Sequence, residues 1–225
     1  AFFPVGVAKA NLEVLGKLKD KRATEALTKV ALKREASQSF LFNILAAQQL
    51  VGIADPAAIP TFIKALYFFD INNPAMRMND VATSGLVAIG RPALDPLLKV
   101  LRGEDEEANA IVKLYIEAIK QKDADAARKL DARTIISNEA AFTLGKLGFR
   151  VVVCESGAAC LAAVDREAGS GVPPTVIADI VMPTLDNQGF LGGLELLEKL
   201  RRAHPEVPVV AVTAYPDENV KAQVL

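Results

Sequence analysis

Hydrophobic positions in the first two thirds of the chain follow helical spacing and also repeat at a longer interval. Residues 15–20 (LGKLKD) align with residues 50–55 (LVGIAD) at an offset of 35 positions. Internal periods of this length are typical of stacked structural repeats. Three sets of positions fall in register: Ala23, Ala58 and Ala93; Leu27, Phe62 and Leu97; Ala31, Leu66 and Leu101.

Each repeat predicts two amphipathic helices with a short break, because its apolar residues are spaced three and four apart. The clearest pair spans residues 39–53 and 57–66, and further helices are expected at 106–120 and 135–147. Pro56 and Pro92 stand where second helices begin, and a first helical turn tolerates proline. Such pairs bury their apolar faces by stacking, which predicts an α-solenoid with Leu27, Phe62 and Leu97 in equivalent buried positions.

The pattern changes after Phe149. Three short β-branched runs, at 150–154, 175–178 and 207–212, alternate with helical patterns at 158–166, 194–203 and 216–225. Strands that alternate with helices predict βαβ units and a parallel sheet. We therefore expect two domains, a helical repeat domain at 1–147 and an α/β module at 148–225.

Composition narrows the function classes. The 225 residues are 51% hydrophobic and 24% charged, enough apolar material for a sizeable core. A net charge of -1 lacks the basic excess typical of nucleic-acid binding. No apolar stretch is long enough to span a bilayer, and we expect a cytoplasmic protein. The first residue is Ala1 rather than Met, so we expect the sequence to be a piece of a longer chain.

The inventory of reactive side chains is short. Cys154 and Cys160 are the two cysteines, and we expect buried free thiols rather than a disulfide framework or a zinc site. His204 is the single histidine, so a catalytic triad or a histidine-rich metal site has almost nothing to build on. Its place after a helical pattern predicts a helix cap.

One pair of residues points to chemistry in the α/β module. Asp179 follows the run TVIA, and Thr213 follows the run VVAV. The carboxyl ends of parallel strands meet at one edge of a sheet, where ligands of open α/β sheets bind. In a phosphoryl transfer Asp179 would be the nucleophile and Thr213 would meet the phosphoryl oxygens. The alternative for Asp179 is a carboxylate that caps the following turn.

The amino-terminal repeats resemble the HEAT-repeat family. Residues 89–101 (IGRPALDPLLKVL) are close to its pattern, and the resemblance covers about residues 8–147. It implies a helical surface that binds protein partners.

The carboxy-terminal segment resembles the receiver domain of bacterial two-component response regulators. The matching pieces are GFRVV at 148–152, ESG at 155–157, DIVMP at 179–183, GLELL at 193–197 and PVVAVTAY at 208–215. By that resemblance Asp179 matches the phosphoacceptor and a Mg²⁺ ligand, and Thr213 matches the switch hydroxyl. A histidine kinase would be the phosphoryl donor.

The sequence also departs from the receiver pattern. Receivers open with a strand that ends in paired carboxylates for Mg²⁺, but the strand-like run at 134–138 (TIISN) offers Ser137 and Asn138. Asp131 stands at about the right separation but follows RKL rather than a buried strand. The segment 187–192 interrupts the usual pattern after the Met-Pro turn, and the receiver's last strand and helix are missing. Mg²⁺ is therefore expected only if the site is functional.

The junction between the two domains has two interpretations. Residues 144–147 (LGKL) repeat residues 15–18 as the first half of a fourth helix pair would, yet they equally suit the end of a receiver's first helix. Either the domains share a helix, or ordered segments of a longer chain have been joined here.

The connection at 67–78 is longer and more apolar than a helix pair requires. Phe68, Phe69 and Met76 are therefore candidates for partner binding. The alternative is that the aromatic rings fill the gap between repeats.

These observations predict a signalling or scaffold protein, not an enzyme, which binds partner proteins through a HEAT-like solenoid and a degenerate or partial receiver module. The main alternative is a working response regulator that is phosphorylated on Asp179 with Mg²⁺. A HEAT-repeat lyase acting on a bound chromophore or small ligand is a third alternative, but the repeats lack the acid/base pairs it needs.

Overall fold

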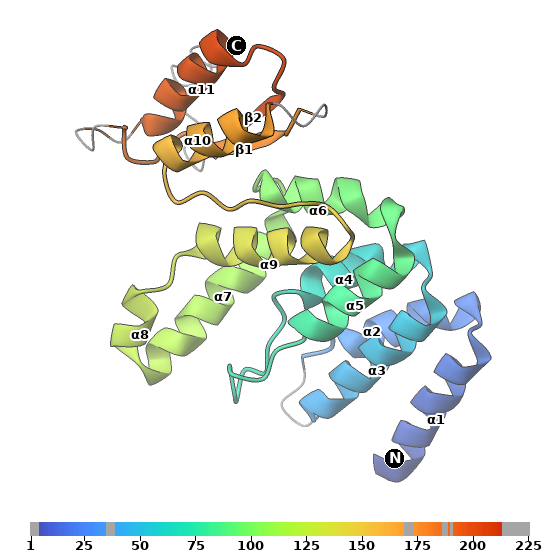
Figure 1. The fold of residues 1–225 in the computed structure, drawn as a ribbon. Helices are drawn as coiled ribbons and strands as arrows, with labels where there is room; N and C mark the ends of the chain where they lie inside the picture. Colours follow the sequence, from blue (N-terminus) through green and yellow to red (C-terminus); the bar gives the residue numbers. More distant parts are fainter. Residues whose placement is uncertain (1–4, 35–38, 169–172, 186–188, 190, 213–225) are drawn as a thin grey trace. The chain divides into compact units, whose positions relative to one another are not determined.

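The architecture comes from a computed structural model (Figure 1), which describes residues 5–34, 39–168, 173–185, 189 and 191–212. These residues are mostly helical, with one small parallel sheet. The chain divides into two compact units, Ala1–Val151 and Val152–Leu225. We name them the helical unit and the α/β unit.

The helical unit begins with three helix pairs, in each of which a short 3-10 turn precedes the second helix. The pairs are α1 (Val5–Leu18) with η1 (Lys21–Ala23) and α2 (Thr24–Ala31); α3 (Phe40–Ile53) with η2 (Pro56–Ala58) and α4 (Ile59–Ala65); α5 (Asn79–Ile89) with η3 (Arg91–Ala93) and α6 (Leu94–Leu101). Three further helices follow: α7 (Glu106–Lys122), α8 (Ala124–Arg128) and α9 (Ala132–Lys146).

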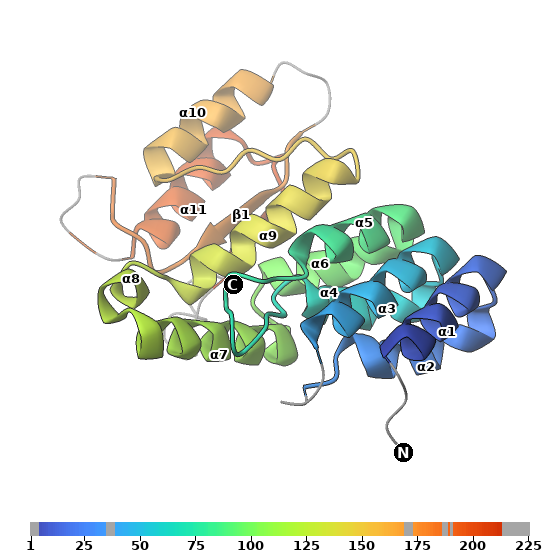
Figure 2. The ribbon, with the colours of Figure 1, turned by 90° about the horizontal axis from the view of Figure 1, so that it is seen from below.

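One packing relation recurs along the helical unit. Helix α3 packs against α1 and α2, α5 packs against α3 and α4, and α9 packs against α5 and α6. Figure 2 shows α1, α3, α5 and α9 following one another in one layer. Leu27, Phe62 and Leu97 lie in α2, α4 and α6 and are completely buried, so the prediction of equivalent burial is confirmed.

Aspartates at equivalent places cap the short 3-10 turns of the first two pairs. Asp20 and Asp55, 35 residues apart, cap η1 and η2 by accepting hydrogen bonds from backbone amides. The Thr24 hydroxyl also donates to Asp55 across the two pairs, at 3.0 Å. In the third pair Gly90, with φ of 81°, stands at this position instead.

Helix α9 includes the strand-like residues 134–138, and the helix predicted over 135–147 is confirmed. Asp131 caps its first turn, accepting from the Thr134 amide at 2.7 Å. Ile136 and Leu144 are buried against the preceding helices. The sequence allowed this segment to be the first helix of a fourth pair or the first helix of a receiver. In the structure α9 packs after α5, as the first helix of a fourth pair would.

The connection at 67–78 contacts α9 within the helical unit. The Tyr67 hydroxyl donates to the Ile136 carbonyl at 3.0 Å, and Arg77 forms an ion pair with Glu139 at 2.7 Å. Phe68 and Phe69 are buried. The aromatic residues of this connection thus belong to the core.

The α/β unit contains two helices and two strands among its described residues. They are α10 (Gly157–Glu167), β1 (Val176–Asp179), α11 (Gly192–Ala203) and β2 (Val209–Val212). Two of the three predicted strands and two of the three predicted helices are confirmed, and the helix expected at 216–225 lies outside the described residues. Residues 150–154 form no strand, so that prediction is wrong. A strand needs a hydrogen-bonded neighbour, and β1 pairs only with β2 in the described part of the sheet.

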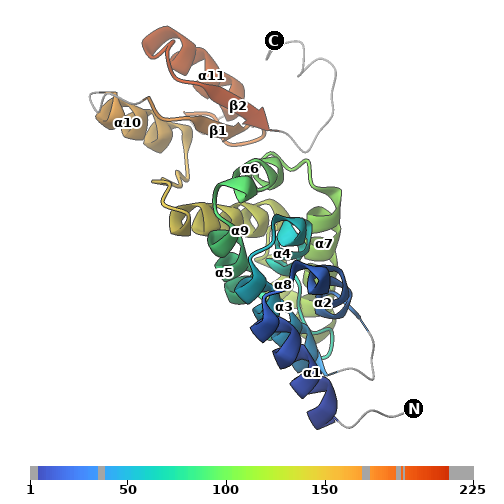
Figure 3. The same cartoon turned by 90° about the vertical axis from the view of Figure 1, so that its right-hand side faces the viewer.

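Both helices of the α/β unit cover the same face of the sheet (Figure 3). Val176 and Ala178 of β1 share a buried cluster with Val164 of α10 and with Leu196 and Leu200 of α11. Side chains alternate across a strand, so Ile177 and Asp179 lie on the opposite face. Across the described helices of both units, none is long and apolar enough to cross a membrane.

Candidate functional site

Asp179 stands at the carboxyl end of β1, as expected from the sequence. The two strands are parallel, and Asp179 is in register with Val212, the last residue of β2. Thr213, the proposed switch hydroxyl, comes next in the chain but lies outside the described residues. The register nevertheless fixes where β2 ends relative to the carboxylate.

The Asp179 side chain is half-buried and takes part in a local turn. One carboxylate oxygen, Oδ1, accepts a hydrogen bond from the Val181 amide at 3.0 Å. This is the capping arrangement considered as an alternative to a phosphoacceptor role. A carboxylate accepts more than one hydrogen bond, so capping and ligand binding are chemically compatible.

Two adjacent glycines let α11 start directly against the β1 strand end. The Gly192 amide donates to the Met182 carbonyl at 2.8 Å, and the Gly193 amide donates to the Ile180 carbonyl at 3.2 Å. A Cβ on Gly193 would overlap the Asp179 carbonyl. The receiver resemblance included Gly193, but the sequence analysis did not predict that both glycines are needed. The signal in the sequence was the pair of glycines directly before an amphipathic helical pattern.

The segment that interrupts the receiver pattern is closed by hydrogen bonds at its base. The Gly189 amide donates to the Thr184 hydroxyl at 2.8 Å, and the Thr184 amide donates to the Gly189 carbonyl at 3.0 Å. The Leu185 amide donates to Glu195 of α11 at 2.9 Å. Gly193 nevertheless stays packed on the Asp179 carbonyl of β1.

Asp131, and Glu139 just after the run at 134–138, are the nearby carboxylates that could complete a metal site, and both have structural partners in the helical unit. Asp131 caps α9, and Glu139 pairs with Arg77. Within the parts of the chain that the structure describes, no three His, Cys, Asp or Glu residues gather into a group that could hold a metal ion. Mg²⁺ in such sites takes carboxylate and phosphate oxygens, and the described residues do not assemble that donor set around Asp179.

The thiols and the histidine lie elsewhere in the α/β unit. Cys154 and Cys160 are both free and half-buried. Burial, and then the neighbouring Cys154, raise the pKa of the Cys160 thiol to about 11, which keeps it protonated. His204 is the C-cap residue of α11, as predicted, and its Nε2 lies 2.7 Å from Asp165 of α10.

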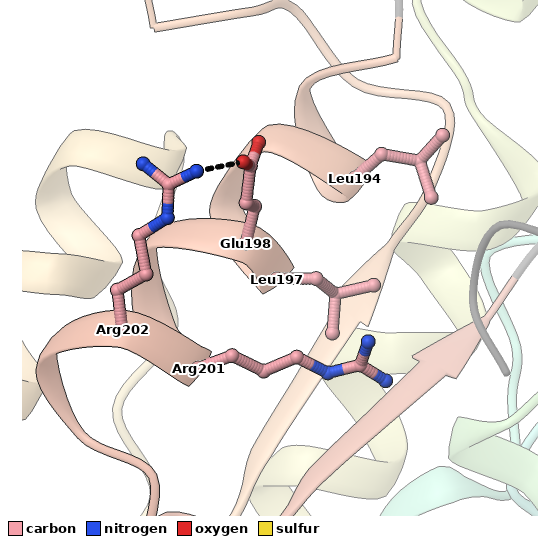
Figure 4. Close-up of a pocket in the computed structure, with 5 residues that line it drawn as sticks. All are labelled: Leu194, Leu197, Glu198, Arg201 and Arg202. Atoms are coloured by element: carbon pink, nitrogen blue, oxygen red, sulfur yellow. Dashed lines mark hydrogen bonds and ion pairs between the residues drawn. The ribbon is translucent and has the colours of Figure 1, made fainter.

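Grooves on the described surface include one on α11 and one in the helical unit. One, of about 420 Å³, follows a single face of α11 and is lined by Leu194, Leu197, Glu198, Arg201 and Arg202, with an ion pair between Glu198 and Arg202 (Figure 4). The other, of about 480 Å³, lies between α4 and α6 in the helical unit.

The groove between α4 and α6 combines apolar and charged side chains. Ile59 and Ile63 are buried at the base of the groove, while Lys99 and Asp95 line it with opposite charges. Lys64 on the same groove pairs with Glu107 of α7 at 2.7 Å.

The candidate partner-binding residues divide into two kinds. Phe68 stacks on Phe40 with ring centroids 6.0 Å apart, and Phe69 meets Tyr115 edge to face at 5.2 Å. Both are buried, so in this structure they fill the core between helices, as in the alternative weighed for them. Met76 is 39% exposed and remains accessible.

Comparisons with known proteins bear on the carboxy-terminal part of the chain. No curated protein sequence matches the chain. Residues 129–225 match the family model of the response regulator receiver domain. The match begins before α9 and therefore includes a helix that packs in the helical unit. This part of the chain is thus similar to response regulator receiver domains, a similarity that indicates a role in signalling.

Proposed function

We propose that this protein is a cytoplasmic signalling or scaffold protein, not an enzyme, whose receiver module no longer accepts a phosphoryl group. Its helical unit is a HEAT-like solenoid that binds partner proteins. Its α/β unit keeps the receiver pattern after β1 but not the metal-binding part before it.

The packing of α9 is the observation that carries the proposal. The receiver match begins at residue 129, so a receiver's first strand and helix would come from the segment that forms α9. This segment packs on α5 and α6, and its carboxylates Asp131 and Glu139 cap a helix and pair with Arg77. Asp179 alone leaves the charge of a transferring phosphoryl group largely uncompensated.

The helical unit supports the binding role. Its three helix pairs repeat one packing relation, and in such stacks each pair covers its neighbour and leaves an extended surface. The groove between α4 and α6, which Asp95 and Lys99 line with opposite charges, lies on the layer of second helices. We propose this groove as the contact for a protein partner.

The test is the intact mass of the full chain after incubation with acetyl phosphate and Mg²⁺. We expect that the parent chain gains no phosphoryl group. We also expect that it does not bind the beryllium fluoride mimic. The comparison includes Asp179→Asn and, as a matched control on an exposed carboxylate of α8, Asp125→Asn. A receiver with its acidic pair, treated in parallel, verifies the reagent.

A working phosphoacceptor is the second candidate, because Asp179 lies at the end of β1 in register with Val212, and Thr213 follows Val212 in the chain. In that case a carboxylate oxygen of Asp179 attacks phosphorus, and the bond from phosphorus to the acetate oxygen breaks. A phosphoryl group on the parent and on Asp125→Asn, but not on Asp179→Asn, would replace our proposal with this function and make a histidine kinase the expected partner.

A further inference from the structure

The second helices of the three pairs carry lysine at the same position. Lys29, Lys64 and Lys99 stand 35 residues apart, and each is the sixth residue of its helix, in α2, α4 and α6. The residue two positions before each lysine is completely buried in the core. Two positions turn a helix by about 200°, so the three lysines leave the core on its outer side.

The lysines form a row because the second helices lie side by side. Helix α4 contacts both α2 and α6. The Thr61 hydroxyl of α4 donates to the Thr28 hydroxyl of α2 at 3.2 Å, and Lys64 and Lys99 line one groove. Packed helices are about 8–10 Å apart, so neighbouring lysines are expected at about that spacing. We name Lys29, Lys64 and Lys99 the lysine row.

Two members of the lysine row already bind carboxylates. Lys64 pairs with Glu107 of α7 at 2.7 Å, and the Glu107 side chain is 69% exposed. Lys29 pairs with Glu25 of its own helix at 2.7 Å, where both side chains are largely exposed. Exposed ion pairs contribute little to stability, so these carboxylates can give way to others. Lys99 is exposed and has no ion-pair partner among the described residues.

The acidic residues of the same helices do not form a continuous row. Glu25 and Asp95 are in register one turn before the lysines, but Pro60 stands at the equivalent place between them. The charge that continues across all three second helices is therefore positive. A segment with regularly spaced carboxylates is complementary to it.

We propose that the lysine row binds an extended acidic segment of a partner protein, with Asp or Glu at every third position. In the polyproline II conformation every third side chain faces the same side, about 9 Å further along the chain. This distance matches the spacing of packed helices. The lysine row includes both lysines of the groove between α4 and α6, so this partner specifies the proposed function and rests on it.

Fluorescence anisotropy of labelled peptides with the full chain tests the lysine row. The spaced probe repeats Glu-Pro-Ser, the clustered probe has the same composition with every Glu at one end, and the basic probe has Lys in place of Glu. We expect the spaced probe to bind more tightly than the clustered probe and the basic probe not to bind. Binding should weaken as salt rises, because exposed charges are screened.

Variants locate the binding on the lysine row. Lys99→Glu should weaken binding of the spaced probe roughly tenfold, and Lys29→Glu should also weaken it. Lys129→Glu makes the same charge change at an exposed lysine at the end of α8 and should have no effect.

Several outcomes would overturn the acidic partner. They are no binding of the spaced probe up to about 1 mM, equal affinity for the clustered probe, and equal effects of Lys99→Glu and Lys129→Glu. Binding of the basic probe that Asp95→Asn abolishes would overturn it too, yet would keep the groove as a protein contact. Phosphoryl uptake on Asp179 is measured separately, so the proposed function can fail without these results.

Discussion

Phe62 and Gly85 meet in the core of the helical unit, where α4 packs against α5. A Cβ on Gly85 would come within 3.0 Å of the Phe62 ring, closer than real Cβ contacts. The ring is completely buried. The pair therefore shows how one residue's missing side chain makes room for another's large one.

Substitutions on either side of this contact should destabilise the protein. We expect Phe62→Ala to lower the free energy of unfolding by about 3–5 kcal/mol, because it removes a buried ring and leaves a cavity. Gly85→Ala should cost about 1–3 kcal/mol through overpacking. Urea denaturation measures both. Phe62→Leu and Gly85→Ala are also combined in one chain. This double variant should lose less free energy of unfolding than Phe62→Leu and Gly85→Ala lose in sum, and simple additivity would contradict a direct contact.

His204 links α11 to α10 through Asp165, and the hydrogen bond to that carboxylate raises the pKa of the imidazole above 6.5. The stabilisation is fully present below the unfolded pKa of about 6.5 and is lost as the pH rises through the folded value. Since His204 is the single histidine, an NMR titration of its ring reports this pKa without overlap.

In that titration Asp165→Asn should move the pKa of His204 back toward about 6.5. Glu206→Gln should move it less, because Glu206 lies farther away, at 3.5 Å from Nδ1. An unchanged titration in Asp165→Asn would show that the two side chains do not interact in solution.

At the scale of elements, the start of α11 depends on backbone contact with β1. Gly193 meets the Asp179 carbonyl and Ile180 Cα, which are backbone atoms that cannot rotate away. We expect Gly193→Ala to lower the stability of the α/β unit by about 1–3 kcal/mol, as for other overpacked sites. Hydrogen exchange of the β1 and β2 amides measures this loss.

Gly145→Ala is the matched control for this prediction. Gly145 lies inside α9 with nothing within 4 Å of a built Cβ. Alanine there should stabilise the helix by about 0.5–1 kcal/mol, because glycine loses more backbone freedom on folding. Equal loss in both variants would indicate a general intolerance of substitution and not the close contact at Asp179.

At the scale of the whole molecule, helix α9 belongs to the helical unit although the receiver match includes it. Helix α9 repeats the relation of α3 and α5 to the helices before them, and the connection at 67–78 holds it through Tyr67 and Arg77. The receiver match nevertheless starts at residue 129. The helical unit thus gains a further first helix, and β1 has one described strand neighbour, β2.

The amino-acid sequence alone determined the elements that depend on local pattern. The 35-residue register predicted the burial of Leu27, Phe62 and Leu97, because a fixed spacing places residues on the same helix face. The two buried strands and the position of Asp179 at a strand end also followed from the sequence, since β-branched runs between helical patterns are a local signal. The capping role of His204 and the alternative use of Asp179 were visible in the same way.

Only the tertiary structure decided the outcomes that depend on neighbours far along the chain. Residues 150–154 have the composition of a strand but form none, because strand formation requires a hydrogen-bonded partner that composition does not specify. Phe68 and Phe69 are buried because Phe40 and Tyr115 pack on them from distant helices. The place of α9 after α5 in the helical unit also depends on distant residues, because Tyr67 donates to the Ile136 carbonyl and Arg77 pairs with Glu139.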